Sequence, residues 1–444
     1  MRRLSCILLA LLVLLGASGC LVGRRPAPAQ GDPQRAVRRV LPNGVRVVAQ
    51  EHRASDVVAL QLWVAAGGRD EAASELGLAH YLEHMLFKGT TTRPAGFIDR
   101  EVEGVGGRMN AGTSLDYTYY HMLLPARRAL AGIETLADIS VNAALDENQL
   151  EREKRVVLEE MKLAEDTPSR LLARQLYEAV FDGHAYGRPV IGRPELIRAL
   201  TRDQLLAFYR RHYVPESLTL VVVGAVRPDD VVEAATRAFG RFPRSGTQRL
   251  PAPPAASARP RQLQRLRPGA HAYLGLAWPA PRLDHADTPA VDLLTAVLGQ
   301  GRASRLTRSL RERLGLVNTI ATSYAALEAA GIVSITAQLE PANLERAEAG
   351  ILEEVRRIAR DGVSEAERER ALTVAEARRE FQMETAEGRA FTLGHAETIW
   401  TIEEELAYVD HLRSVTREQI RAAAVRYLDP ERFARVVFTP EPAR

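Results

Sequence analysis

The chain has 444 residues, of which 46% are apolar and 26% are charged. This composition is ordinary for a globular protein, and the length predicts two to four domains. The formal net charge is only +3, which excludes the strong positive field of a nucleic-acid-binding protein, so no nucleic-acid partner is expected. Both cysteines, Cys6 and Cys20, lie at the N-terminus, so the body of the chain carries no disulfide and no thiol chemistry.

Residues 1–19 are predicted to be a signal peptide, because two arginines precede an apolar run that is too short for a comfortable membrane span. The small residues Gly16-Ala17-Ser18-Gly19 before Cys20 resemble the bacterial lipobox. The resemblance implies cleavage before Cys20 and lipidation of its thiol; an ordinary secretory signal with an incidental cysteine is the alternative. By the same resemblance, Leu21 after the cysteine favours an outer-membrane anchor facing the periplasm in a host with two membranes. Residues 20–34 are rich in Pro, Ala and Arg and are expected to form a lipidated tether.

Residues 35–243 are expected to form a first α+β half. Residues 45–50 and 57–65 predict strands, because β-branched and apolar side chains dominate them. Residues 77–89 (GLAHYLEHMLFKG) predict a largely buried helix, since apolar side chains cover much of its girth and no proline interrupts it.

This predicted helix carries the pattern H-x-x-E-H in His80, Glu83 and His84. Residues i and i+4 lie on the same helix face, so His80 and His84 can direct both imidazoles at one divalent transition metal, most often zinc. Glu83 lies on an adjoining part of that face, where it can hold a water bound to the metal. Two core histidines beside a solvated glutamate are the alternative, but a glutamate in an apolar helix is costly unless it is paired or linked to a metal.

The next segments predict a helix at residues 97–105 and a strand region at residues 109–124. His121 lies in this strand region. It offers a further imidazole, but we expect it to be hydrogen-bonded within the sheet and not to bind the metal.

Residues 146–165 predict a long helix that carries several glutamates. Glu151 and Glu159 are expected to be solvated charges. Glu160 lies beside a half-apolar face and is the best available third metal ligand, although the pattern alone does not settle the choice against Glu159. Glu153 lies two helical turns before Glu160 on the same face, a place that suits a carboxylate orienting an imidazole.

The H-x-x-E-H pattern, followed further along the chain by E-R-x-x-x-V-x-x-E-E, resembles the M16 metallopeptidase family of pitrilysin, insulinase and the mitochondrial processing peptidase. The resemblance covers essentially the whole chain after the leader. It implies that Glu160 is the third zinc ligand, that Glu153 supports the site, and that Asn110 and Ala111 belong to a substrate-binding edge strand. Residues 213–224 are similar to the segment that closes the first half in the family.

Residues 244–269 are predicted to be a linker, because they are rich in proline. Residues 270–444 then repeat the first half's order of strands and helices without its metal ligands, with strands at 272–277 and 331–339 and helices at 288–298, 344–360 and from Ser364 onward. The sequence therefore predicts an α+β fold of two homologous halves, each a mixed or antiparallel sheet with helices packed on it.

In relatives, an arginine and a tyrosine seven residues apart contact the substrate backbone near the zinc. The arginine position corresponds to Arg311, but the tyrosine position holds Asn318. This departure implies either a weaker contact from Asn318 or an Arg–Tyr pair supplied by another chain. An ion pair between Arg311 and a nearby glutamate is the structural alternative.

Three protein ligands leave a fourth position for water, which is typical of a catalytic zinc site. The expected function is a zinc-dependent endopeptidase with one Zn²⁺ per chain, which cleaves peptides or short unfolded segments with Glu83 as general base on zinc-bound water. The strand around Asn110 and Ala111 is expected to hold the peptide as an added β-strand. The resemblance also implies a homodimer or a heterodimer with a related subunit. The alternative is a non-catalytic scaffold or partner subunit, which the missing tyrosine favours and the complete metal motif opposes.

Overall fold

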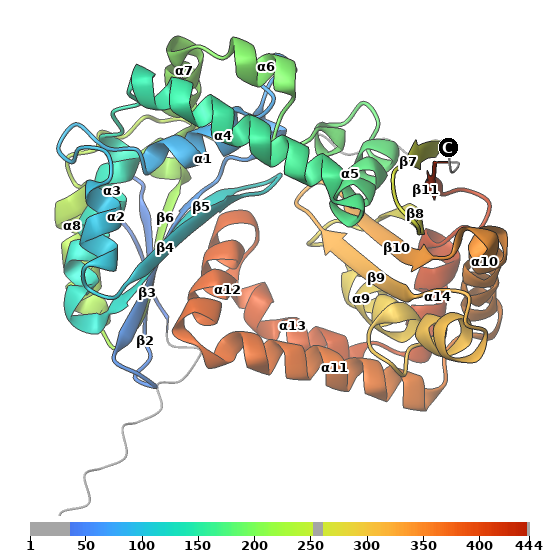
Figure 1. The fold of residues 1–444 in the computed structure, drawn as a ribbon. Helices are drawn as coiled ribbons and strands as arrows, with labels where there is room; N and C mark the ends of the chain where they lie inside the picture. Colours follow the sequence, from blue (N-terminus) through green and yellow to red (C-terminus); the bar gives the residue numbers. More distant parts are fainter. Residues whose placement is uncertain (1–35, 252–260, 442–444) are drawn as a thin grey trace, which may run out of the picture.

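The computed structural model describes residues 36–251 and 261–441, and Figure 1 shows them as two α+β halves side by side. The predicted signal peptide, the lipidation of Cys20 and the predicted tether lie outside the described residues. In the described ranges, every helix is too short or too polar to serve as a membrane span.

The first half is built on a six-stranded sheet with the order β1-β2-β6-β3-β5-β4. The strands are β1 Val37–Val40, β2 Arg46–Glu51, β3 Val57–Val64, β4 Arg108–Thr113, β5 Thr118–Pro125 and β6 Leu218–Gly224. The central strand β6 is buried along its whole length, which explains its unbroken apolar sequence. Strand β4 lies at the edge and pairs with β5 on one side, so its outer backbone groups are left for another strand.

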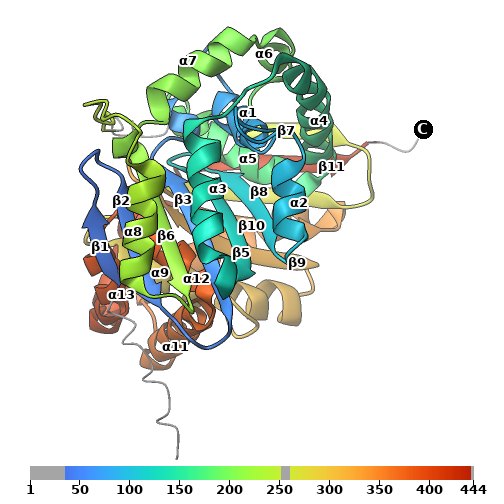
Figure 2. The ribbon, with the colours of Figure 1, turned by 90° about the vertical axis from the view of Figure 1, so that its left-hand side faces the viewer.

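The helices of the first half are α1 Leu78–Leu86, α2 Phe97–Glu103, α3 Ala129–Val141, α4 Glu147–Asp166, α5 Pro168–Val180, α6 Pro194–Ala199, α7 Arg202–His212 and α8 Pro228–Phe239. Helices α3 and α8 pack on one face of this sheet, as Figure 2 shows. Apolar side chains of α1, α3, α8 and the sheet form one buried core, which fixes α1 relative to the strands.

The second half contains a five-stranded sheet with the order β7-β11-β8-β10-β9. Its elements are β7 Gln262–Arg267, β8 Ala272–Ala280, α9 Thr288–Gly299, the π-helix η5 Thr307–Arg313, β9 Thr319–Ala326, β10 Gly331–Leu339, α10 Leu344–Asp361, α11 Glu365–Glu384, α12 Ala386–Ile399, α13 Ile402–Ser414, α14 Arg417–Tyr427 and β11 Ala434–Pro440. Strand β7 runs parallel to β11 as β2 runs parallel to β6, and the strands after them alternate in direction in both sheets. The predicted α+β fold with a repeated unit is confirmed.

Each half contributes a helix that packs on the sheet of the other half. Helix α5 of the first half packs on β8 and β11, while α12 of the second half packs on β3 and β6 (Figure 1). The contact of α12 is close: a Cβ atom on Gly394 would lie 2.0 Å from Nε1 of Trp63. Each sheet therefore buries one of its faces with a helix from the other half, and the two halves form a single packed unit.

The structure differs from the prediction within the proline-rich segment. Residues 262–267 were predicted to be linker, but they form β7, which pairs in parallel with β11 near the C-terminus. Its sequence QLQRLR is polar and mostly exposed, so no local apolar pattern marks it as a strand.

Candidate metal centre

Helix α1 begins where the prediction placed it, after Gly77. Gly77 has φ 97°, a left-handed conformation that favours glycine. Because glycine has no side chain to cap the helix, the buried carboxylate of Glu71 does so, accepting the backbone N–H of Gly77 at 3.0 Å and that of Ala79 at 2.8 Å. Burial raises the pKa of Glu71 to about 8, although these two N–H groups act in the opposite direction.

The structure brings His80, His84 and Glu160 together from α1 and α4. The Nε2 atoms of both histidines lie 3.6 Å from Oε2 of Glu160, and the two ring centroids are 4.7 Å apart. Among the described residues, these three side chains form the one group able to hold a metal ion, with ligand atoms within 4.8 Å of one another. Glu159 instead points outward and pairs with Lys162 at 2.6 Å.

This donor set fits zinc. Zinc–nitrogen bonds of 2.0–2.1 Å in a tetrahedron separate neighbouring ligand atoms by about 3.3 Å, close to the observed 3.6 Å. Burial, and secondarily the nearby charge of His84, lower the pKa of His80 to about 3. His80 is therefore neutral at physiological pH and offers a free lone pair, as a zinc ligand must.

Glu153 lies behind the metal ligands and orients one of them. Its Oε1 lies 2.9 Å from Nδ1 of His84, and its Oε2 lies 3.0 Å from Nζ of Lys88. Burial alone acts to lower the pKa of His84, but the hydrogen bond to Glu153 and the carboxylates of Glu83 and Glu160 raise it overall. Because Glu153 holds the proton on Nδ1, Nε2 is the nitrogen left to face the metal.

Glu83 lies next to the ligands in a nearly buried position. Burial raises its pKa, against the opposing effects of a hydrogen bond from Thr113 and of His84. Thr113 Oγ1 donates that bond to Oε2 of Glu83 at 2.5 Å. The sequence reasoning missed Thr113. The alternation of side chains along β4 could have found it, because Thr113 and Ala111 share the face that meets α1.

Asn110 and Ala111 lie on the edge strand β4, beside the metal residues. A cleft of about 370 Å³ runs there; its lining includes Glu83, His84, Lys88, Asn110 and Glu153. The cleft therefore joins an unpaired strand edge to the carboxylate and imidazole of the candidate centre. Asn110 also accepts the N–H of Ala111 on its Oδ1 at 2.9 Å.

Two other residues of interest lie outside the metal group. His121 is on β5, where its ring stacks on Tyr119 and its Nδ1 lies 3.5 Å from Glu387 of α12. Arg311 is exposed on the π-helix η5, and within the described ranges its side chain makes neither a hydrogen bond nor an ion pair, so the expected alternative of a glutamate partner is not seen there. Asn318 immediately precedes β9, and its N–H donates to the carbonyl of Gln338 at 2.8 Å.

Fold and site together define a two-halved α+β protein with a His-His-Glu centre of the zinc type and a buried carboxylate beside it. Comparison with known sequences identifies the family of this protein. The model for insulinase (peptidase family M16) matches residues 46–193, and the model for the peptidase M16 inactive domain matches residues 199–374. An uncharacterized zinc protease of Mycobacterium tuberculosis is 33% identical over 94% of this chain and 96% of its own length. Another, from Bacillus subtilis, is 28% identical over 90% and 97%. The chain belongs to peptidase family M16.

Solved structures share the fold. A protease from Helicobacter pylori superposes with a TM-score of 0.87 at 22% identity and covers 91% of this chain and 100% of its own. A peptidase M16 inactive domain from Pseudomonas fluorescens gives a TM-score of 0.85 at 20% identity, covering 92% and 98%. At this level of identity the likeness concerns the architecture of the two halves.

Proposed function

We propose that this chain is a zinc-dependent endopeptidase that cleaves peptides or short unfolded segments. The convergence of His80, His84 and Glu160 on one point, with Glu83 beside them, carries the proposal. These residues would hold one zinc ion, which when bound would supply a Lewis acid for the scissile carbonyl and a water of lowered pKa. The names of the zinc protease relatives support this assignment.

Glu83 acts as the general base. Thr113 holds Oε2 of Glu83 by a hydrogen bond, which leaves Oε1 to take the proton of the attacking water and to pass it to the leaving amine. Burial raises the pKa of Glu83, and a raised pKa allows the carboxyl group to retain the proton between these two transfers. Glu153 holds the imidazole of His84 in the required orientation throughout.

The substrate binds as an added strand on β4. Asn110 and Ala111 lie on this edge, beside the cleft that contains Glu83. Backbone pairing of this kind accepts any extended peptide and excludes segments that are already hydrogen-bonded in a folded protein. This geometry supports peptides and unfolded segments as the substrate class.

The working form of the enzyme is proposed to be a homodimer or a heterodimer with a related subunit. Asn318 stands where relatives carry a tyrosine, so Arg311 alone cannot supply the pair that contacts the substrate backbone. A second chain carrying the full Arg–Tyr pair would complete the site. The enzyme is further proposed to be an exported lipoprotein, held by Cys20 at the outer membrane and facing the periplasm.

The second candidate is a non-catalytic scaffold or partner subunit of a heterodimeric peptidase. The substitution at Asn318 favours it. The model described as an inactive domain matches residues 199–374, and this range contains neither Glu83 nor any of the candidate ligands His80, His84 and Glu160. The metal-bearing range is matched by the insulinase model, which favours the catalytic proposal.

Metal analysis and one substitution test the proposal. The purified mature protein is expected to hold about one zinc per chain, and Glu83→Gln is expected to keep the zinc but to lose about 10²–10⁴-fold in cleavage of an unfolded peptide. Glu159→Gln is the matched control, because this glutamate lies on α4 but points away from the centre. Cleavage by Glu83→Gln at the wild-type rate would refute the mechanism. A wild type that binds zinc but cleaves only after a related subunit is added would support the heterodimer.

A further inference from the structure

We propose that Glu71 and the turn before it form a positioning element for α1, the helix that carries His80 and His84. Through this element, the position of α1 depends on the position of the second half. The inference deepens the proposed function by assigning a role to the half that lacks metal ligands, and it rests on that function only for the identity of the ligands.

The first part of the element is the pair of hydrogen bonds between Glu71 and the start of α1. Glu71 is 3% exposed, and its two carboxylate oxygens each accept one N–H at the start of the helix, from Gly77 and Ala79. His80 follows Ala79 directly, and His84 lies one turn further on. A shift of this helix start would therefore rotate or translate both imidazoles together relative to Glu160 on α4.

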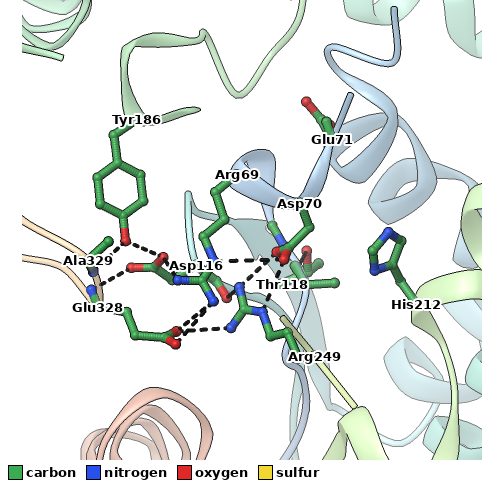
Figure 3. Close-up of polar contacts among 12 residues, drawn as sticks. Arg69, Asp70, Glu71, Asp116, Thr118, Tyr186, His212, Arg249, Glu328 and Ala329 are labelled. Atoms are coloured by element: carbon green, nitrogen blue, oxygen red, sulfur yellow. Dashed lines mark hydrogen bonds and ion pairs between the residues drawn. The ribbon is translucent and has the colours of Figure 1, made fainter. Parts of the chain in front are cut away.

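The second part is the turn η1 (Gly68–Asp70), whose side chains form ion pairs where the two halves meet (Figure 3). The Arg69 guanidinium, almost completely buried, lies 3.2 Å from Asp116 and 3.1 Å from Glu328. Asp70 accepts a bond from Arg249 at 2.7 Å, and Arg249 reaches Glu328 at 3.1 Å. Glu328 belongs to the turn between β9 and β10, so this network joins η1 to the second half.

Further bonds fix the same junction from the backbone side. The fully buried carboxylate of Asp116 accepts the backbone N–H of Glu328 at 3.0 Å and the hydroxyl of Tyr186 at 2.6 Å. The Tyr186 hydroxyl in turn accepts the N–H of Ala329 at 3.0 Å. Arg188, two residues beyond Tyr186, donates to the carbonyl of Glu71 at 2.8 Å. Buried charged groups paired in this way hold one geometry, because each displacement leaves a charge without its partner.

Three consecutive residues thus connect the two places. Arg69 contacts Glu328 of the β9–β10 turn directly, Asp70 contacts it through Arg249, and Glu71 binds the first turn of α1. Because the three residues are consecutive in the chain, a displacement of the β9–β10 turn is expected to move the start of α1. Glu71 and Glu328 are positioning residues in this scheme, since neither touches the metal ligands.

The test compares Glu71→Gln, Glu71→Ala and Glu328→Gln with the control Glu431→Gln. Glu431 is also an ion-paired glutamate of the second half, but its partner Arg356 is on the surface. Zinc affinity is measured by competition with a chromogenic chelator. Amide hydrogen exchange of residues 77–82 is measured in zinc-free protein, and thermal unfolding is recorded in parallel.

Glu71→Gln keeps one acceptor oxygen and turns an NH₂ group toward the other N–H, so zinc affinity is expected to fall about tenfold, and further in Glu71→Ala. Glu328→Gln is expected to act in the same direction with about a threefold loss, since it acts through η1. The double variant Glu71→Ala/Glu328→Gln should bind zinc no more weakly than Glu71→Ala, because both changes break one chain of contacts. Exchange of residues 77–82 should be faster in Glu71→Gln and Glu328→Gln, and unchanged in Glu431→Gln.

Several results would overturn the inference. A merely structural role predicts a lower melting temperature with zinc affinity and exchange of residues 77–82 unchanged. Unaltered behaviour of Glu328→Gln beside an altered Glu71→Gln would remove the second half from the scheme, as would additive losses in the double variant. If the wild type binds no zinc, the proposed function fails, and hydrogen exchange in the zinc-free protein still decides the inference. Glu71→Gln gives the same readouts should Glu71→Ala fail to fold.

Discussion

Glu153 offers a direct measure of how strongly a residue outside the metal ligands supports the centre. Its carboxylate joins Nδ1 of His84 at 2.9 Å to Nζ of Lys88 at 3.0 Å, in a side chain that is 7% exposed. In Glu153→Gln, the amide oxygen can still accept from His84, but the amide N–H₂ meets the Lys88 ammonium with donor against donor. In Glu153→Ala both bonds are lost, and the imidazole of His84 is free to change tautomer and to rotate.

The size of the effect follows from these contacts. Carboxylates that orient metal-bound imidazoles contribute about 10–100-fold to metal affinity, or about 1.4–2.7 kcal/mol of binding free energy. Since Glu153→Gln keeps one of the two bonds, we expect about a tenfold loss of zinc affinity, and about a hundredfold loss in Glu153→Ala. The loss should be larger at higher pH: Glu153 also raises the pKa of His84, so its removal lessens the competition of protons for His84 at low pH and partly offsets the lost orientation there.

Zinc affinity can be measured by competition with a chromogenic chelator at fixed pH and ionic strength. Glu151→Gln is the matched control, because Glu151 lies two residues from Glu153 and so on roughly the opposite side of α4, is 61% exposed and pairs with Lys154 at 2.7 Å. We expect this control to bind zinc like the wild type. Wild-type affinity in Glu153→Ala would refute the claim that Glu153 fixes the orientation of His84, and equal losses in Glu151→Gln would show that the charge of α4 acts without regard to position.

Three further outcomes are expected. Glu160→Ala removes a ligand and should lower zinc affinity at least about a hundredfold, whereas Glu159→Ala should leave it unchanged in the same chelator assay. Thr113→Val should lower the cleavage rate about tenfold at unchanged zinc content, measured by steady-state kinetics, because it frees the carboxylate of Glu83, the proposed general base. Glu367 accepts two bonds from Arg305, and these, with bonds from Ser364, lower its pKa from 4.5 to about 2; Glu367→Gln should unfold about 1–2 kcal/mol more easily at pH 7 in chemical denaturation. That difference should shrink as the pH falls from 4.5 toward 2, where the wild-type carboxylate becomes protonated; a difference independent of pH would contradict the assignment.

Helix α1 could be predicted from the sequence because the pattern that defines it is local. The spacing of His80 and His84 fixes their common face once the segment is helical, and the apolar residues around them require that helix to be buried. The choice of Glu160 over Glu159 as the third candidate ligand does not follow from a local pattern. Both lie on α4, and the burial pattern of that helix is set by α1 and α5, which pack against it. Composition alone could not settle it, whereas the family resemblance pointed to Glu160.

Long-range partners account for what sequence reasoning did not find. Strand β7 exists because β11, far along the chain, supplies its hydrogen bonds, and its own residues carry no strand pattern. Glu71 lies outside the predicted helix that it caps, so no capping rule applied to adjacent positions identifies it. Both cases concern groups whose partners are fixed only by the tertiary fold.

The second half has a structural role in the first half, because its helix α12 covers one face of the first sheet. Val48, Ala59, Trp63 and Val221 form the face of the first sheet that α12 covers. Without α12 this apolar face would meet water, at a cost of about 25 cal/mol for each Å² exposed, and β3 and β5 would lose the support that holds the edge strand β4 beside α1. The second half therefore supports, through α12, the sheet beside which His80, His84 and Glu160 are brought together.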